Sequence, residues 1–142
     1  MLQSVKKFLD CQSEMMLSDN VAGMVDYFRF PLSIHLADEV LVYKTSADLV
    51  EGLQGLSDSY QNLGIREVRW RLSAIELMRK NRFRIWVGWD HVYPGGVQTT
   101  GASIIYYCAF AGGKLAVEMV QYTAHQPATF AGLSARGEAR TA

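Results

Sequence analysis

Four long runs of alternating hydrophobic and polar residues fill the second half of the chain, and this alternation predicts β-strands. The predicted strands cover residues 65–79, 82–93, 97–111 and 114–124. Three short segments separate the strands, namely Lys80-Asn81, Gly95-Gly96 and Gly112-Gly113. Because Gly-Gly pairs supply the positive φ angles that two-residue hairpin turns need, the strands are predicted to be antiparallel neighbours.

The first half of the chain predicts helices. Residues 3–16 mix apolar positions with charges, which is typical of an amphipathic helix. Residues 21–28 repeat apolar side chains at helical spacing, behind Ser18 or Asp19 as an N-terminal cap. Pro31 is predicted to end this second helix, because proline cannot continue the hydrogen-bond ladder.

A short strand pair and a longer third helix follow. Residues 33–37 and 40–43 predict a short hairpin or a bent strand pair. Thr45 and Asp48 resemble a capping box at the start of the helix, and Gly64 stands where its C-terminal cap belongs. The apolar residues of this helix step by four, three, four and three, through Leu49, Leu53, Leu56, Tyr60 and Leu63.

These elements predict an α+β fold. A curved antiparallel sheet of four long strands, with a short hairpin, wraps around three N-terminal helices and forms a cone with a pocket. Residues 1–124 are expected to make up this single domain, since their length suits one hydrophobic core. Residues 125–142 are rich in small and polar side chains and are predicted to form a mobile tail.

Two-residue turns would set the strand registers, and alternation then assigns each side chain to one face of the sheet. The face toward the helices is predicted to be densely apolar, and its polar members include Glu76, Gln98 and Thr100. On this register His91 lies opposite Trp70. The large side chains expected to line the pocket and contact a ligand are Trp70, Trp89, Tyr106, Met119 and Tyr93.

The outer face is predicted to carry an apolar patch with a rim of Arg and Glu. Arg71 is expected opposite Asp90 there, as a cross-strand ion pair, which makes Asp90 a structural residue. An exposed apolar patch suggests a partner surface, so we expect a homodimer through this face. The central residues of the predicted patch are Trp86, Ile105, Tyr107 and Val120.

The charge balance narrows the choice of partners. Lys and Arg number 14 and Asp and Glu also number 14, so net charge offers no attraction to nucleic acid or to acidic membranes. Seven of the 14 basic residues lie between Arg66 and Arg84. We interpret this cluster as the rim of the predicted interface, because no RNA-binding motif accompanies it.

Other function classes find no support in the sequence. Cys11 and Cys108 are expected to be free buried thiols, and no CxxC or HExxH spacing predicts a metal site. No glycine-rich phosphate loop is present, so no cofactor is expected. No apolar run approaches ~18 residues and no signal sequence is apparent, so the expectation is a cytoplasmic protein without a membrane segment.

Three residues are candidates for chemistry. His91 is either a pocket acid or base, since imidazole titrates near neutral pH, or a half-exposed residue at the sheet margin. His35 alternates with Ile34 and Leu36, and its direction, pocket or solvent, is left open. Tyr27 either presents its hydroxyl to a ligand or packs in the core.

The order of elements resembles the nuclear transport factor 2-like superfamily, the cystatin-like α+β cone that includes SnoaL-like and ketosteroid-isomerase-like proteins. The local sequences that carry the likeness are residues 27–31 (Tyr-Phe-Arg-Phe-Pro) and 45–50 (Thr-Ser-Ala-Asp-Leu-Val). The resemblance covers residues 3–124 and implies a pocket between sheet and helices and frequent homodimers. Where its steroid isomerases carry a carboxylate base, this chain has His35, which departs from that mechanism.

The function expected is the binding of a small apolar or aromatic ligand, with no reaction assigned. One alternative is a lyase or isomerase, similar to polyketide cyclases or dehydratases, that acts on a cyclic or carbonyl-containing molecule with His35 or His91 as base. Another is a subunit that binds only other proteins. An enzyme predicts a cavity in which a histidine lies within hydrogen-bond reach of a second polar group, and a binding protein predicts a cavity without such a pair.

Overall fold

The computed structural model describes residues 1–124 and 138–141 of the chain. The first half contains α1 (Leu2–Met16), α2 (Ala22–Val25), β1 (Phe28–His35), β2 (Glu39–Tyr43) and α3 (Ser46–Asn62). The second half contains β3 (Glu67–Ile75), β4 (Arg82–Val92), a 3-10 turn (Pro94–Gly96), β5 (Gln98–Ala111), β6 (Lys114–Ala124) and β7 (Glu138–Thr141). The predicted α+β class is confirmed.

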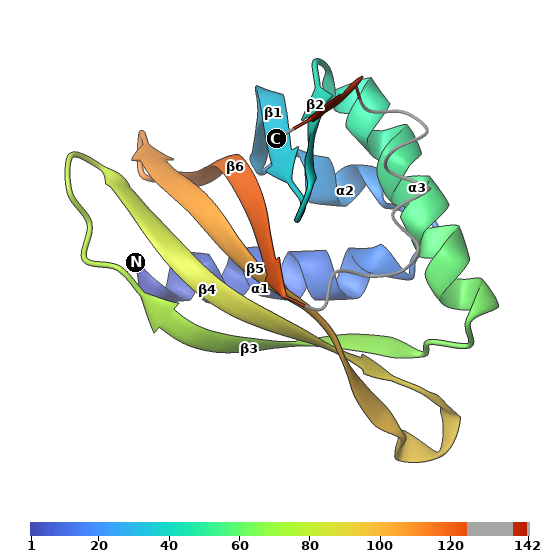
Figure 1. Cartoon of the computed structure of the whole chain (residues 1–142). Helices are drawn as coiled ribbons and strands as arrows, with labels where there is room; N and C mark the ends of the chain where they lie inside the picture. Colours follow the sequence, from blue (N-terminus) through green and yellow to red (C-terminus); the bar gives the residue numbers. More distant parts are fainter. Residues whose placement is uncertain (125–137, 142) are drawn as a thin grey trace.

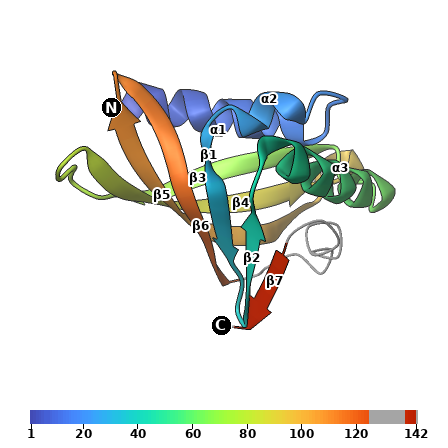
Figure 2. The same ribbon diagram turned by 90° about the horizontal axis from the view of Figure 1, so that it is seen from above.

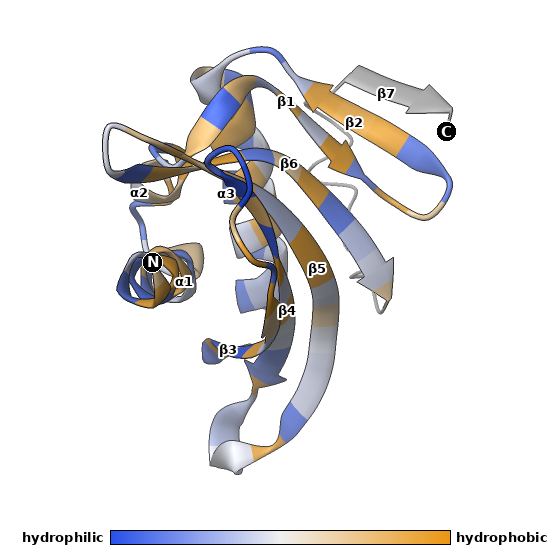
Figure 3. Ribbon diagram, turned by 90° about the vertical axis from the view of Figure 1, so that its left-hand side faces the viewer, coloured by the Kyte–Doolittle hydropathy of each residue, from blue (hydrophilic) through white to orange (hydrophobic). Residues whose placement is uncertain are grey.

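One curved sheet holds all the strands, in the order β3-β4-β5-β6-β1-β2-β7. Neighbours are antiparallel except β1 and β6, which run parallel. The helices lie along its concave side, with α1 beside β3 and α3 across the far end (Figure 1, Figure 2). Viewed along α1, the sheet bends around that helix (Figure 3). Sheet and helices therefore form the predicted cone.

The core lies between the concave face and the helices. Phe8 of α1 is fully buried and meets three aromatic rings edge-on, those of Tyr27, Phe28 and Tyr106, at 5.1, 6.2 and 5.2 Å between centroids. Edge-to-face pairs of this kind add to the free energy of apolar burial. The aromatic contacts tie α1 to β1 and to the centre of the sheet.

The third helix begins and ends as predicted. Thr45 accepts a hydrogen bond from the backbone N–H of Asp48 at 3.2 Å, which satisfies one of the unpaired donors of the first turn. Gly64 has a φ of 82°, the left-handed conformation that ends many helices. Leu49, Leu53 and Leu56 of this helix are buried on the sheet side.

The second helix is much shorter than predicted. α2 has four residues, and the chain already belongs to β1 at Phe28, so Pro31 lies inside a strand and does not end a helix. Proline is tolerated there because the pairing of β1 with β6 is irregular between Phe28 and Ser33. The apolar residues of this segment are buried by strand pairing instead of by a helix.

Two of the three hairpin turns form as predicted. Lys80 and Asn81 have φ angles of 52° and 62°, and Gly112 and Gly113 have 60° and 76°. Positive angles at both central residues are what a type I′ turn requires. The third connection is not a two-residue turn, because Pro94–Gly96 forms a 3-10 turn.

Away from the turns, bulges shift the predicted registers. In β5 the extra residue is Gly101, because Trp89 pairs with Ala102 whereas Asp90 pairs with Thr100. Beyond such an extra residue, side chains that simple alternation assigns to one face point to the other. The predicted face assignments are therefore correct on one side of each bulge and inverted on the other.

Two further segments differ from the sequence predictions. β3 ends at Ile75, whereas the strand was predicted to continue to residue 79, and Leu77 is 84% exposed. Most of the predicted tail, residues 125–137 and 142, lies outside the described residues, and Glu138–Thr141 forms β7 beside β2. Among the described residues, no helix has the length and apolar character needed to cross a membrane.

Candidate functional site

A cavity of about 80 Å³ lies between the concave face of the sheet and the helices. Its walls are mainly apolar, with the leucines of α3 facing Ala102 and Ile104 of β5. The polar residues among its lining are Gln12, Tyr60, His91, Tyr106 and Tyr122. An apolar hollow with a few convergent polar groups is the usual form of a small-ligand site.

A buried hydrogen bond joins Trp89 of β4 to Tyr106 of β5 at the cavity wall. Trp89 Nε1 donates to Tyr106 Oη at 3.0 Å, which uses one lone pair of the phenol and leaves its proton for another acceptor. Within the described part of the chain, that proton has no acceptor. Burial raises the pKa of Tyr106 well above its usual range, so the hydroxyl keeps its proton.

His91 of β4 also lines the cavity. Its side chain is 8% exposed, and its ring lies against Tyr60 of α3, with centroids 4.7 Å apart. Burial lowers the pKa of His91, and the nearby Asp90 carboxylate opposes that shift only in part. The imidazole is therefore neutral at pH 7 and has one donor and one acceptor nitrogen.

The position of His91 depends on the bulge at Gly101. A β-carbon added to Gly101 would lie 2.2 Å from Nε2 of His91, far inside any permitted contact. The imidazole thus lies directly over the glycine backbone. Among residues 1–124 and 138–141, no protein group forms a hydrogen bond with it.

Gln12 and Tyr60 carry further polar atoms into the buried region. Gln12 Nε2 donates to the backbone oxygen of Met24 at 3.1 Å, and no described residue donates to Gln12 Oε1. Tyr60 is 5% exposed, and its hydroxyl likewise has no hydrogen-bond partner among the described residues. Burial raises the pKa of Tyr60, so this phenol also stays neutral.

A bulge in β6 exchanges two predicted positions. Cys108 pairs with Val117 whereas Tyr107 pairs with Met119, so Glu118 is the extra residue. Beyond it, Val120 and Tyr122 line the cavity. Met119, predicted to contact the ligand, is on the outer face, and Val120, predicted for the outer patch, is on the inner one. Both assignments were wrong for the same reason, since one inserted residue inverts the alternation.

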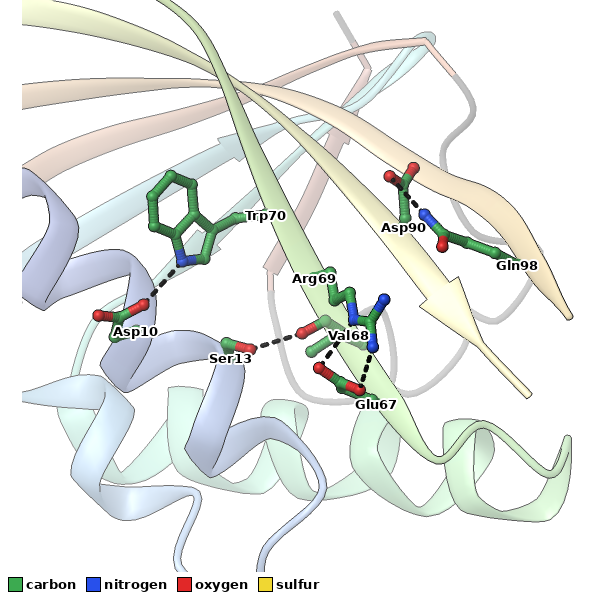
Figure 4. A network of polar contacts seen from close by, with 8 residues as sticks. All are labelled: Asp10, Ser13, Glu67, Val68, Arg69, Trp70, Asp90 and Gln98. Atoms are coloured by element: carbon green, nitrogen blue, oxygen red, sulfur yellow. Dashed lines mark hydrogen bonds and ion pairs between the residues drawn. The ribbon is translucent and has the colours of Figure 1, made fainter. Parts of the chain in front are cut away.

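Trp89, Tyr106 and His91 are the predicted site residues that the structure brings together around the cavity. Trp70 lies on the same face but opposite Trp89 rather than His91, and its indole N–H donates to Asp10 of α1 at 2.8 Å (Figure 4). It therefore packs under α1 and does not line the cavity. Tyr93 is half-buried beside Val92, outside the cavity lining.

The other two candidates for catalysis lie elsewhere. His35 pairs with Gln121 of β6 while Ile34 pairs with Val120, and Ile34 is the member of β1 that lines the cavity. His35 therefore points away from it. Tyr27 packs its ring against Phe8, and it too is absent from the lining.

The outer face of the sheet gathers the charges. Arg71 Nε and a terminal nitrogen bind the Asp90 carboxylate at 2.6 and 3.0 Å. Gln98 Nε2 also donates to Asp90, at 3.1 Å (Figure 4). The hydrogen bonds from Arg71 hold the pKa of Asp90 below its usual range. The predicted Arg71–Asp90 pair is present, although Arg71 pairs by register with Gly88.

Three polar residues predicted for the inner face belong to the outer one. Gln98 reaches Asp90, and Thr100 pairs with Asp90 beyond the Gly101 bulge. Glu76 forms an ion pair with Arg84, because β3 carries an extra residue relative to β4 between Leu72 and Ala74. The consequence is a cavity without a charged side chain in its described lining.

Charged side chains also cover part of the predicted apolar patch. The guanidinium carbon of Arg84 lies 5.0 Å from the centre of the Trp86 ring, a cation–π contact. Tyr107 donates its hydroxyl proton to Gln121 at 2.9 Å.

In the part of the chain that the structure describes, no group of three or more potential metal ligands occurs.

No known family profile matches the sequence, and no curated protein matches it. Solved structures match the fold instead. An NTF-2-like protein of unknown function from Shewanella oneidensis aligns with a TM-score of 0.68 and 10% identity over 87% of this chain and 98% of its own. A domain of unknown function with a cystatin-like fold from Nostoc punctiforme gives a TM-score of 0.65 at 11% identity over 86% and 75%.

The chain has the nuclear transport factor 2-like cone fold. A third similar structure, ActVI-ORFA from Streptomyces coelicolor, aligns at a TM-score of 0.63 and 15% identity over 86% of this chain and 92% of its own. At such identities the likeness shows the fold alone, because many unrelated functions share one fold. The chemistry of this protein must therefore be argued from its own side chains.

Sequence reasoning missed two polar residues of the cavity, Gln12 and Tyr122, whereas Tyr60 belongs to the apolar stripe that was predicted for α3. Gln12 lies four residues after Phe8 on the same face of α1, so helical spacing alone could have placed it inside. Tyr122 could not be found in this way, because only the bulge at Glu118 turns it inward.

Proposed function

We propose that this protein binds a small, largely apolar molecule inside the cone and does not transform it. The observation that carries the proposal is the cavity itself, of about 80 Å³, walled by leucines and aromatic rings. One water needs ~10–15 Å³ of such space, so the cavity has room for several water-sized groups and a single small ring is the scale of probe to use.

The absence of a hydrogen-bonded histidine pair favours binding over catalysis. His91 is the histidine in the cavity lining, and among described residues it makes a ring contact with Tyr60 but no hydrogen bond. General bases in acyl or proton transfer are normally oriented by a second polar group. The geometry supports a binding protein more strongly than a lyase or isomerase.

Filling the cavity tests the proposal. Ala102 is 3% exposed and lines the cavity, so Ala102→Leu should occupy the space and abolish binding of cyclopentane. Ala74→Leu is the matched control, because Ala74 is exposed at the outer edge of β3. Binding is followed by the Trp89 indole N–H resonance in ¹H–¹⁵N NMR spectra. Cyclopentane that shifts this resonance equally in wild type and Ala102→Leu would contradict the proposal.

An isomerase activity is the second candidate, and the neutral, buried imidazole of His91 is the observation that favours it. A base of this kind would remove a proton next to a carbonyl. Exchange of the α-protons of cyclopentanone with solvent deuterium, measured by ¹H NMR with and without the protein, tests it. Acceleration by the wild-type protein that disappears in His91→Phe would support the isomerase. The same exchange rate with and without the protein would argue against the isomerase and leave binding as the proposed function.

A homodimer through the outer face is a separate proposal. Trp86 and Tyr107 are half-buried on that face, while Val120 is not available because it lines the cavity. Trp86→Glu should elute later than wild type in size-exclusion chromatography if the sheet face joins two copies. An unchanged elution volume would remove Trp86 from any interface.

A further inference from the structure

The cavity holds unused hydrogen-bonding capacity at several deeply buried positions. Tyr106 accepts from Trp89 and keeps a proton to donate, and His91 has no hydrogen-bond partner among the described residues. On α1, Gln12 Oε1 likewise accepts no hydrogen bond from a described residue. Their side chains are 6%, 8% and 5% exposed. Buried polar groups in folded proteins nearly always have a partner, either a protein group or an ordered water, so these positions are expected to bind a water or a ligand.

All of these groups are neutral. Burial holds Tyr106 in its protonated form and His91 in its uncharged form. Asp90, the charged neighbour of His91 in the chain, is turned to the outer face and bound there by Arg71. Because no Asp, Glu, Lys or Arg belongs to the described cavity lining, a charged ligand would lose its hydration without gaining a counter-charge.

Tyr106 and His91 border the same cavity at different points, because Tyr106 pairs with Ile85, which is six residues before His91 on β4. They lie on the neighbouring strands β5 and β4, both on the concave face, and both belong to the cavity lining. Tyr60 of α3 closes the space beside them, with its ring 4.7 Å from that of His91. The hydrogen bond from Trp89 polarises the Tyr106 hydroxyl and makes it a stronger donor.

We propose that the cavity selects a ligand with an uncharged oxygen, a carbonyl or a hydroxyl, which accepts a hydrogen bond from Tyr106. The inference rests on the proposed binding function and adds the polar chemistry of the ligand to it. The apolar remainder of the ligand packs against the leucines of α3. Carboxylates and amines of the same size are excluded.

Three probes of one ring size separate the contributions. Cyclopentane tests the apolar cavity, cyclopentanone adds an uncharged oxygen, and cyclopentanecarboxylate adds a charged group. Cyclopentanone should bind about 3- to 10-fold more tightly than cyclopentane, the net effect of one hydrogen bond in a buried site. Cyclopentanecarboxylate should bind at least about 10-fold more weakly than cyclopentanone, because its charge is not compensated.

Two of the three tryptophans, Trp89 and Trp70, provide the readout. In ¹H–¹⁵N spectra the Trp89 indole resonance should move on binding, because its proton is bonded to Tyr106. The Trp70 indole is bonded to Asp10 outside the cavity, so its resonance should stay in place. Binding inside the cone is thereby distinguished from binding elsewhere on the surface.

Matched variants assign the oxygen contact. Tyr106→Phe should remove the advantage of cyclopentanone over cyclopentane while both still bind. Tyr107→Phe, which removes a hydroxyl from the next residue on the opposite face, should keep that advantage.

The outcomes separate the inference from the proposed function. Equal affinity of wild type for cyclopentane and cyclopentanone would overturn the inference and leave the binding function standing. Equal affinity for cyclopentanone and cyclopentanecarboxylate would also overturn it. Failure of all three probes to shift Trp89 would overturn the binding function, and the inference with it. These comparisons need only the wild-type chain, so they hold even if Tyr106→Phe does not fold.

Discussion

The two faces of the sheet differ in the charge and in the hydrogen bonding of their polar side chains. On the outer face, charged side chains are paired, as Arg71 is with Asp90 and Arg82 is with Glu118. On the inner face the polar groups are neutral, and those of His91 and Tyr106 have unused hydrogen-bonding capacity among the described residues. Paired charges on the outer face favour a structural role, whereas the unused capacity in the buried hollow is the basis of the ligand that we propose.

A pair of glycines on adjacent strands illustrates the contrast. A β-carbon on Gly88 would lie 2.7 Å from the Arg71 guanidinium on the outer face, and one on Gly101 would lie 2.2 Å from His91 on the inner face. Each glycine makes room for one polar side chain. On the outer face, Arg71 lies over Gly88 and forms an ion pair with Asp90. On the inner face, His91 lies over Gly101 and lines the cavity.

The largest effect expected comes from the packing of the inner face. Phe8→Ala removes a fully buried ring and its aromatic contacts, so it should lower the free energy of unfolding by about 3–5 kcal/mol. Met119→Ala is a truncation on the outer face, where the side chain is half-exposed, and should cost clearly less. Urea denaturation measures both. Similar losses in the two variants would remove the difference in packing between the faces.

Neighbouring tyrosines provide the sharpest test of the contrast. Tyr106→Phe leaves the buried indole N–H of Trp89 without a partner and should cost about 1–3 kcal/mol of stability. Tyr107→Phe removes a hydroxyl bonded to Gln121 at a half-exposed position and should cost less, because water can replace the bond. An equal cost, measured by thermal or urea unfolding, would contradict the conclusion that water cannot replace the buried Trp89–Tyr106 hydrogen bond.

The pH dependence of stability should depend on His91. Its folded-state pKa is lowered by burial, so below the unfolded pKa near 6.5 the unfolded state binds more protons than the folded state. Stability should therefore fall as the pH drops from about 7 towards 5, by at most about 1.4 kcal/mol per pH unit.

His91→Phe should flatten that dependence between pH 7 and 5 in urea titrations. His35→Asn keeps His91 and should retain its share of the slope. A slope that persists unchanged in His91→Phe would show that another group causes it, and the assignment of a neutral, buried imidazole to His91 would then be wrong.

The smallest effect is expected at an exposed ion pair. Arg82 and Glu118 are bonded at 2.9 Å, but the Arg82 side chain is 66% exposed and well solvated. Arg82→Gln should change stability too little to resolve by urea denaturation, because surface pairs gain little over hydration. The comparison is repeated in 1 M NaCl, where screening should reduce any difference further. A large, salt-independent loss would contradict this assignment.

The first and third helices and two of the three turns followed directly from local sequence. The cap at Thr45, the stop at Gly64 and the turns at Lys80-Asn81 and Gly112-Gly113 depend on side-chain donors or on positive φ angles at single residues. Such requirements are local and can be read without knowing what the segment packs against. The pattern of long strands, and with it the cone, came from the same kind of information.

Which residues face the cavity was decided by the tertiary structure. Single inserted residues at Gly101 and Glu118 reverse the alternation, so Tyr122 turns inward, Met119 turns outward and Gln98 joins Asp90. The position of a bulge depends on how two strands curve against each other and against the helices, and no residue type marks it uniquely. Hydrophobic order along the chain therefore determined the architecture, while the pairing of distant strands selected the side chains of the site.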